Sequence, residues 1–240
     1  MSRLLAAEAV TKRFQGLTAV DAVSFGVDRG EILAIIGPNG AGKTTLFNLL
    51  TGQLAPTDGR VLFAGRDIGA LPPHRRAKLG LGRTFQIAKT LTSLTTLENA
   101  MVGAFLRHRG LAAAERAAMA VLKRVGLGAR AHVSSGSLTL SERRRLEVAR
   151  ALATEPEIIL LDEVMAGLNP AEIDAAIQLF RDLHGDGHTF LVIEHNLKVV
   201  RAFSQRVLVL DHGSLIASGT PDEVLSNPQV IEAYIGRKRQ

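Results

Sequence analysis

Apolar residues in the first third of the chain form short runs separated by polar, glycine-containing turns. Such runs are typical of β-strands, and they predict strands at residues 4–10, 22–27, 32–36 and 61–63. A helical pattern follows the third run, at residues 43–50. This part of the chain is therefore expected to be mainly β-structure.

Beyond residue 86 the apolar residues take a helical spacing. Segments rich in Ala and Leu predict helices at residues 98–105, 112–125 and 141–152. Strand-like runs then alternate with further helices, the strands at 158–161, 190–193 and 207–210 and the helices at 171–183 and 196–203. The segment 221–235 predicts two short helices, interrupted at Asn227-Pro228.

This alternation indicates the fold class. Strands that are apolar at every position are buried on both faces, as in a parallel sheet covered by helices. We therefore predict an α/β fold in a single domain over residues 1–240. It would consist of a core, residues 1–86 and 156–240, and a helical insertion, residues 87–155.

Composition narrows the classes of function. Hydrophobic residues make up 46% of the chain and charged residues 22%, which excludes a disordered or fibrous protein. Aromatic residues make up only 4%, too few for a nucleic-acid surface built on stacked aromatics. The chain has no Cys, so disulfides, thiolate zinc sites and a Cys nucleophile are excluded. No apolar run approaches the roughly 18 residues of a membrane span, and we expect a soluble, cytoplasmic protein.

Basic residues outnumber acidic ones by 29 to 23. An anionic partner or a phosphorylated ligand would explain this excess, and so would solvated helix faces. Charge alone therefore leaves the function open.

The segment Gly37–Thr44 matches the phosphate-binding loop G-x-x-x-x-G-K-[ST] in full. It lies between a predicted strand and a predicted helix, which is the context that this loop requires. Its glycines let backbone N–H groups face phosphate oxygens, Lys43 would reach the β- and γ-phosphates, and the Thr44 hydroxyl would bind Mg²⁺. The sequence therefore predicts a nucleoside triphosphate site.

Two carboxylates, Asp162 and Glu163, follow the apolar run at residues 158–161. The carboxyl ends of parallel strands are where ligands of such folds bind. Asp162 would hold Mg²⁺ through its water shell, and Glu163 would polarise the attacking water. Alone this pattern marks a strand end as often as a site, and the upstream loop favours the site.

The order of these segments resembles that of the ATP-binding cassette (ABC) ATPases over nearly the whole chain. The family's glutamine loop matches Gln86, its aromatic adenine platform Phe14, and its switch histidine His195, while Ala166–Pro170 matches the segment after the second carboxylate. The resemblance implies a P-loop fold with a mainly parallel sheet, an N-terminal antiparallel β-subdomain and a helical insertion. As a single residue, Phe14 or His195 would equally fit a structural role.

The resemblance also implies a full set of site residues, with ATP and Mg²⁺ as cofactors. Glu163, His195 and Gln86 would be catalytic, and Thr44, Gln86 and Asp162 would hold the metal. ATP would contact Phe14, Gly37, Pro38, Asn39, Gly40, Ala41, Gly42, Lys43, Thr44 and Thr45.

Within the family, the chain is similar to ATPases of branched-chain amino acid importers, notably at residues 80–86, 166–170, 219–224 and 227–236. That similarity implies a peripheral protein on the cytoplasmic face of the membrane. Its partners would be a second ATPase subunit, identical or different, two membrane permeases and, indirectly, a periplasmic or extracellular substrate-binding protein. Importers of urea and amides have similar ATPases.

One segment departs from the family pattern. The family signature reads Leu-Ser-Gly-Gly-Gln, and here the signature segment is Leu138-Thr139-Leu140-Ser141-Glu142. Thr139, Leu140, Ser141 and Glu142 would face the ATP of the partner subunit. There Ser141 adds bulk, and Glu142 adds a negative charge that costs on the order of 1–4 kcal/mol, offset in part by Arg143–Arg145. We expect slow turnover at any site that this segment completes. Val164, where the family has Pro, would change loop stiffness more than chemistry.

Three other functions fit parts of the sequence. A soluble ABC ATPase acting on nucleic acid or the ribosome commonly carries two cassettes or a long coiled coil, and neither occurs here. The ATPase of a lipid exporter has nearly the same machinery. The altered signature would also fit a regulatory cassette with impaired hydrolysis. We expect no direct nucleic-acid partner.

Overall fold

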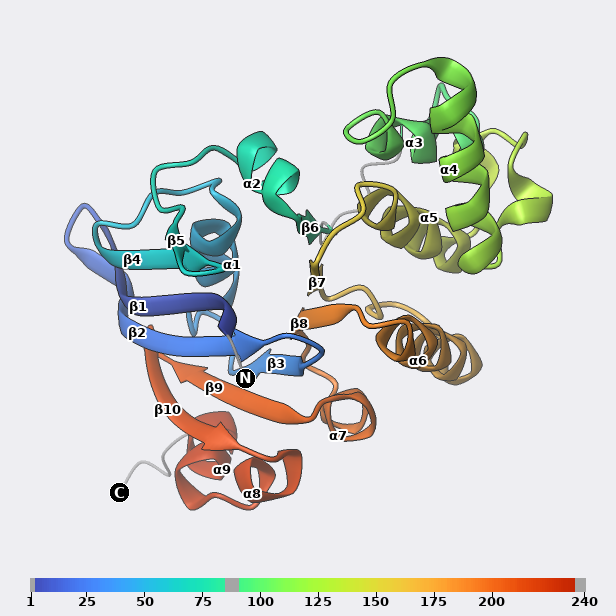
Figure 1. Cartoon of the computed structure of the whole chain (residues 1–240). Helices are drawn as coiled ribbons and strands as arrows, with labels where there is room; N and C mark the ends of the chain where they lie inside the picture. The colour runs from blue at the N-terminus through green and yellow to red at the C-terminus, as the bar shows by residue number, and fades with distance from the viewer. Residues whose placement is uncertain (1–2, 85–90, 236–240) are drawn as a thin grey trace. The chain divides into compact units, whose positions relative to one another are not determined.

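The computed structural model describes residues 3–84 and 91–235, which divide into two compact units (Figure 1). Unit 1 comprises residues 1–76 and 189–240, and unit 2 comprises residues 77–188. The predicted division into a core and an insertion at residues 87–155 stays a prediction.

An antiparallel sheet forms the N-terminal part of unit 1. Its strands have the order β2-β1-β4-β5 and are β1 (Arg3–Phe14), β2 (Leu17–Asp28), β4 (Asp58–Phe63) and β5 (Arg66–Asp67). The pairing of β1 with β2 shifts register several times, and Ala9 and Ala22 have left-handed backbone in these strands. The bulges explain why the alternation of apolar and polar residues identified only parts of β1 and β2. After each extra residue, the side chains that faced inward alternate with the opposite phase.

Parallel strands form the second sheet of unit 1. β3 (Ile32–Ile36) lies between β8 (Thr189–Ile193) and β9 (Arg206–Asp211), parallel to both, and β10 (Ser214–Gly219) is antiparallel to β9. Every residue of β3 and β8 is buried. The predicted α/β class is confirmed, because continuous apolar runs do form parallel strands here.

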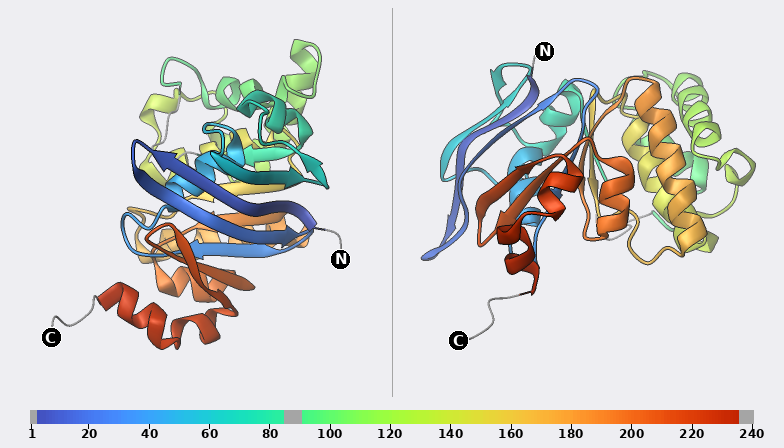
Figure 2. Two further views of the ribbon diagram at one scale, coloured as in Figure 1. Left: turned by 90° about the vertical axis from the view of Figure 1, so that its left-hand side faces the viewer. Right: turned by 90° about the horizontal axis from the view of Figure 1, so that it is seen from below.

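Helices of unit 1 cover this second sheet. They are α1 (Lys43–Thr51), α7 (Leu197–Phe203), α8 (Pro221–Leu225) and α9 (Pro228–Ile235). Figure 2 shows α8 and α9 beside β9 and β10. Val224 of α8 and Val230 of α9 are buried in one apolar cluster with Ala34 and Ile36 of β3. The C-terminal helices are thereby part of the core that supports β3.

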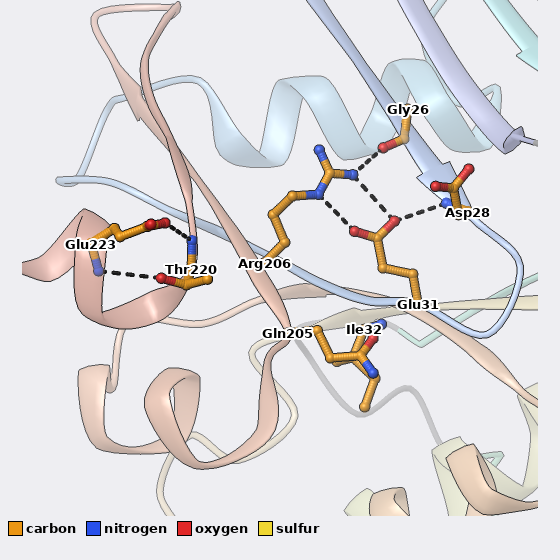
Figure 3. A network of polar contacts seen from close by, with 8 residues as sticks. All are labelled: Gly26, Asp28, Glu31, Ile32, Gln205, Arg206, Thr220 and Glu223. Atoms are coloured by element: carbon orange, nitrogen blue, oxygen red, sulfur yellow. Dashed lines mark hydrogen bonds and ion pairs between the residues drawn. The ribbon is translucent and has the colours of Figure 1, made fainter. Parts of the chain in front are cut away.

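A partly buried ion pair fixes the start of β3. Arg206 of β9 lies 2.7 Å from the Glu31 carboxylate, and Glu31 also accepts the N–H of Asp28 at 2.8 Å (Figure 3). The side chain of Gln205 accepts the N–H of Ile32 at 2.9 Å. Side chains of the β9 end therefore hold the turn that leads into β3.

Unit 2 combines two short parallel strands with a helical cluster. β6 (Leu81–Arg83) pairs with β7 (Ile158–Asp162), and α2 (Pro73–Leu79) precedes β6 across the boundary between the units. α3 (Thr96–Ala104), α4 (Leu111–Arg124) and α5 (Leu140–Leu152) pack on one another, and α6 (Pro170–Gly185) follows β7 (Figure 1). Short 3₁₀ turns lie at Gly128–Arg130 and Ser135–Ser137.

Besides the two-residue strand β5 and the two 3₁₀ turns, three elements were not predicted. β6 has only three residues, one of which is glycine, and β10 is half-buried with two serines, so neither is a continuous apolar run. α2 was missed because its residues are mostly basic and give no apolar pattern. One of them, Arg76, is nevertheless buried, with 1% of its surface exposed. Among residues 3–84 and 91–235, no helix is long and apolar enough to cross a membrane.

Candidate nucleotide-binding site

The phosphate loop connects β3 to α1 in unit 1. Gly37 and Gly42 both have left-handed backbone, with φ of 151° and 98°. A Cβ at Gly37 would lie 2.1 Å from the carbonyl oxygen of Leu210, and one at Gly42 would lie 2.4 Å from that of Ala19. Any other residue at either position would clash with backbone, so the loop shape requires glycine.

The N-terminus of α1 presents its N–H groups without a side-chain cap. Its N-cap residue is Gly42, and its first turn contains no acidic residue. The first N–H groups of a helix have no partner within the helix and carry partial positive charge, which suits a phosphate.

Lys43 is held against the same loop. Its Nζ donates to the carbonyl oxygens of Gly37 at 2.7 Å and of Pro38 at 2.9 Å, and the residue is buried. These bonds keep the ammonium group at the loop, within reach of a ligand on the amide groups. The other predicted ATP contacts from Asn39 to Thr45 are in the loop or in the first turn of α1.

The C-terminal helix α9 also reaches the phosphate loop, and the sequence did not indicate this. Residues Pro38–Ala41, Asp211, His212 and Gln229 line a hollow of about 790 Å³ there, together with Ile216, Glu232 and Ala233. Burial raises the pKa of Tyr234 in α9, and a hydrogen bond with the Gly37 backbone acts in the opposite direction. Tyr234 is the one tyrosine of the sequence, a signal that could have drawn attention to α9.

Unit 1 also carries two of the predicted ligand contacts, Phe14 and His195. Phe14 ends β1 with 41% of its surface exposed, and Lys12 Nζ lies 5.3 Å from its ring centroid. An exposed ring is available for stacking, whereas a core phenylalanine would be buried. His195 is exposed and lies two residues beyond the end of β8, next to Asn196, the N-cap of α7. Gln86 lies outside the described residues.

In unit 2, Asp162 ends β7 and is only 2% exposed. Its Oδ2 accepts a hydrogen bond from Arg83 Nη2 at 3.1 Å, and its backbone N–H donates to Thr84 Oγ1 at 3.2 Å. Burial lowers the pKa of Arg83, and the charge and hydrogen bond of Asp162 raise it again. The carboxylate is therefore ionically paired within its own unit, which the sequence did not indicate.

Glu163 has an unusual backbone. Its φ of 49° is left-handed, a conformation that non-glycine residues rarely adopt. The next residue, Val164, is buried at 2% exposure. The left-handed φ at Glu163 is a backbone strain directly after Asp162, and strain of this kind clusters at functional sites.

The donor chemistry of the predicted metal ligands fits magnesium. Thr44 offers a hydroxyl oxygen and Asp162 a carboxylate oxygen, and Mg²⁺ prefers oxygen ligands, often one or two carboxylates with phosphate and water. Among the described residues, no cluster of three or more His, Asp or Glu side chains forms a separate metal site.

The signature segment in unit 2 begins α5. Thr139 is the N-cap, its Oγ1 accepts the N–H of Glu142 at 3.2 Å, and Glu142 Oε2 accepts the N–H of Thr139 at 2.9 Å. Glu142 also forms an ion pair with Arg130 Nε at 3.1 Å. The backbone N–H of Thr139 is the largest cause that lowers the pKa of Glu142, and Arg130 adds to it.

These contacts correct the expectation that Arg143–Arg145 offset the charge of Glu142. The cation that pairs with Glu142 is Arg130, from the 3₁₀ turn before α5, whereas Arg143 donates to the carbonyl oxygens of Leu138 and Gly136. Charge compensation at the signature segment thus comes from a part of the chain that sequence proximity did not suggest. Leu140 lies against Gly167, so the segment also contacts the loop after Glu163.

Comparison with known proteins decides the family. The family model described as ABC transporter matches residues 20–166, and the one described as branched-chain amino acid ATP-binding cassette transporter matches residues 214–239. The chain belongs to the ABC transporter family. The predicted family, its ATPase class and its nucleotide-binding fold are confirmed at this level.

Relatives of this ABC cassette cover its whole length. It is 40% identical to the high-affinity branched-chain amino acid transport ATP-binding protein BraF of Pseudomonas aeruginosa, over 98% of this chain and 99% of that one. It is 36% identical to the lipopolysaccharide export system ATP-binding protein LptB of Acidithiobacillus ferridurans, over 100% of both.

Solved structures of ATP-binding cassettes also resemble this chain. The ADP conformation of MJ1267, an ATP-binding cassette of an ABC transporter, has a TM-score of 0.90 at 33% identity, covering 99% of this chain and 100% of that one. A dimeric post-hydrolysis state of the cassette MJ0796, bound to ADP and Pi, has a TM-score of 0.81 at 28% identity, over 90% and 98%. The roles of individual site residues stay predictions.

Proposed function

We propose that this cassette is the ATP-hydrolysing subunit of an importer for branched-chain amino acids or related small amides. The observation that carries the proposal is the phosphate loop, which leaves the N-terminus of α1 uncapped and holds Lys43 against it. The substrate class is supported by the match at residues 214–239 and by the full-length similarity to BraF.

In this proposal each predicted residue has one task. The loop and Lys43 bind the phosphates, Phe14 stacks on adenine, and Thr44 and Asp162 hold Mg²⁺, which neutralises phosphate charge. Glu163 polarises the attacking water, and His195 hydrogen-bonds the γ-phosphate. Positioning and charge neutralisation of this kind are the main requirements of phosphoryl transfer. Gln86, for which the resemblance implies contact with the metal or water, keeps that proposed role.

The proposal also includes partners. Two cassettes would pair, which the dimeric form of MJ0796 supports. The pair would close around two nucleotides, with the signature segment of each cassette facing the ATP of the other. Two membrane permeases would hold the pair at the cytoplasmic face of the membrane, and a substrate-binding protein would deliver the amino acid. A heteromeric pair would contain one site completed by a standard signature.

Reconstitution tests the proposal. The cassette, co-purified with the permeases and second ATPase encoded by neighbouring genes, is placed in proteoliposomes with ATP inside and the binding protein outside. We expect ATP-dependent uptake of radiolabelled leucine or isoleucine, and none with Lys43→Met. Extraction of a lipid from the membrane instead of uptake would favour lipid export, to which the similarity to LptB points.

A further inference from the structure

The carboxylate that the proposed function assigns to magnesium binding is already paired with a guanidinium group. Arg83 is the last residue of β6, which runs parallel to β7, and Asp162 is the last residue of β7. Both side chains therefore leave adjacent strands at the same edge. Arg83 Nη2 donates to Asp162 Oδ2 at 3.1 Å.

Water is largely excluded from this contact. The side chains of Arg83 and Asp162 are 11% and 2% exposed. A charge-assisted hydrogen bond at such a site is screened much less than a surface ion pair. Arg124 and Asp186 of the same unit form an ion pair of the same chemistry with side chains 40% and 52% exposed, which provides an internal comparison.

Arg83 and the residue after it hold Asp162 from two sides. Thr84 Oγ1 accepts the N–H of Asp162 at 3.2 Å, and the N–H of Thr84 donates to the Leu160 carbonyl at 3.0 Å. The Thr84 contacts fix the backbone at the end of β7, so the orientation of the Asp162 side chain is left to its own partners. The structure shows one of these to be a cation.

We propose that Arg83 is the internal counter-cation of Asp162: it holds the carboxylate in the metal-free protein, and Mg²⁺ arriving with nucleotide displaces it. This inference rests on the proposed function, in which Asp162 holds Mg²⁺ through its water shell. Two cations that use the same carboxylate compete, so the guanidinium lowers the affinity of the site for metal. Arg83 is thus a positioning residue that makes metal loading reversible.

Metal affinity tests the competition directly. Mn²⁺, which replaces Mg²⁺ and is detected by electron paramagnetic resonance, is titrated into protein saturated with ADP. Because Arg83→Gln removes the charge-assisted hydrogen bond that opposes metal binding, it should tighten Mn²⁺ binding about tenfold. Arg83→Lys keeps the cation and should stay within about threefold of wild type, and the control Arg124→Gln should not differ from wild type.

The outcomes separate this inference from the proposed function. Wild-type protein that binds neither ADP nor Mn²⁺–ADP overturns both. Wild-type binding with unchanged or weaker Mn²⁺ affinity in Arg83→Gln overturns the inference alone, and weaker binding would make Arg83 an orienting partner of the metal-bound carboxylate.

Wild-type protein supplies a second measurement that needs no folded Arg83→Gln variant. In ¹⁵N-arginine spectra the guanidinium of Arg83, assigned with Arg83→Lys, should exchange its protons slowly in metal-free protein. Mg²⁺ with ADP should speed that exchange by about tenfold or more, as expected when one strong hydrogen bond is lost. An exchange rate that is the same with and without Mg²⁺–ADP contradicts displacement.

Discussion

The N-termini of α1 and α5 solve the same physical problem in opposite ways. At each of them, the first backbone N–H groups have no hydrogen-bond acceptor within the helix. At α5, Thr139 and Glu142 satisfy two of them through a capping box, and an acidic side chain stands in the first turn. At α1, Gly42 offers no side chain and no acid is present.

A capping box is the ordinary solution in this protein. Thr95 and Glu98 form one at α3, Asn169 and Glu172 at α6, and Thr220 and Glu223 at α8. α4 also lacks a side-chain cap, but a Cβ at its N-cap Gly110 would meet open space, whereas at Gly37 and Gly42 of the phosphate loop a Cβ would meet backbone. A helix N-terminus can therefore bind an anion where no side chain caps it and where the loop before it has a fixed shape. At the signature segment, in contrast, side chains of the chain itself cap the helix N-terminus and stabilise α5.

The largest effect that this comparison predicts is at α1. Lys43→Met removes the cation at the open N-terminus and should lower ATPase activity by about 10²–10³-fold, the usual loss for one preorganised electrostatic donor. Steady-state phosphate release measures it. Lys123→Met, at an exposed lysine of α4, is the control. Activity of Lys43→Met within tenfold of wild type would contradict the assignment.

Glu163 should separate binding from hydrolysis. In Glu163→Gln the water loses its base, so kcat should fall about 10²-fold or more while the Kd for ATP stays within about threefold. The matched control is Glu155→Gln, since Glu155 is also a carboxylate with left-handed φ, at 51° against 49°. Equal losses in both variants would show that backbone strain, and not chemistry, is responsible.

At α5 the charge of Glu142 can be removed while its cap is kept. Glu142→Gln preserves the capping box. Arg130 already pairs with the carboxylate, so the repulsion between Glu142 and the partner's ATP should be about 1 kcal/mol, the low end of the range of about 1–4 kcal/mol. ATPase activity of a homodimer should rise about fivefold, and further with Ser141→Gly. The control is Glu172→Gln in the capping box of α6. An unchanged rate would show that the charge of Glu142 does not slow hydrolysis.

The capping hydroxyl itself should affect stability rather than chemistry. Thr139→Ala removes the acceptor for the Glu142 N–H and should lower the free energy of unfolding by about 1 kcal/mol. Urea denaturation measures it, Thr139→Ser should restore most of it, and Asn169→Ala at α6 should cost a similar amount. A loss of activity without a loss of stability would instead show that Thr139 contacts nucleotide.

The smallest effect is a pH dependence. The pKa of Glu142 is lowered from 4.5 by the Thr139 N–H and by Arg130, so the carboxylate stabilises the folded state above pH 4.5. That stability is lost as the pH falls below 4.5 and through the lower pKa of the folded state. The difference in unfolding free energy between wild type and Glu142→Gln should shrink over this range. A difference that does not vary with pH would mean that the carboxylate is not the stabilising group.

Sequence alone determined the elements whose signals are local. Residues 32–36 and 158–161 form parallel strands because continuous apolar runs must be buried on both faces, and the glycine pattern of residues 37–44 allows one loop shape. Family resemblance supplied the predicted roles of Phe14 and His195, since a single residue encodes neither its exposure nor its position in the fold.

Tertiary structure alone decided which charges meet. Arg83 lies far from Asp162 along the chain, Arg130 replaced the expected partners of Glu142, and α9 came to the phosphate loop. Each of these contacts joins segments that strand pairing or helix packing brings together, and no local pattern encodes such pairings. The sequence therefore predicted where phosphate binds, whereas the fold decided which charged side chains pair with one another.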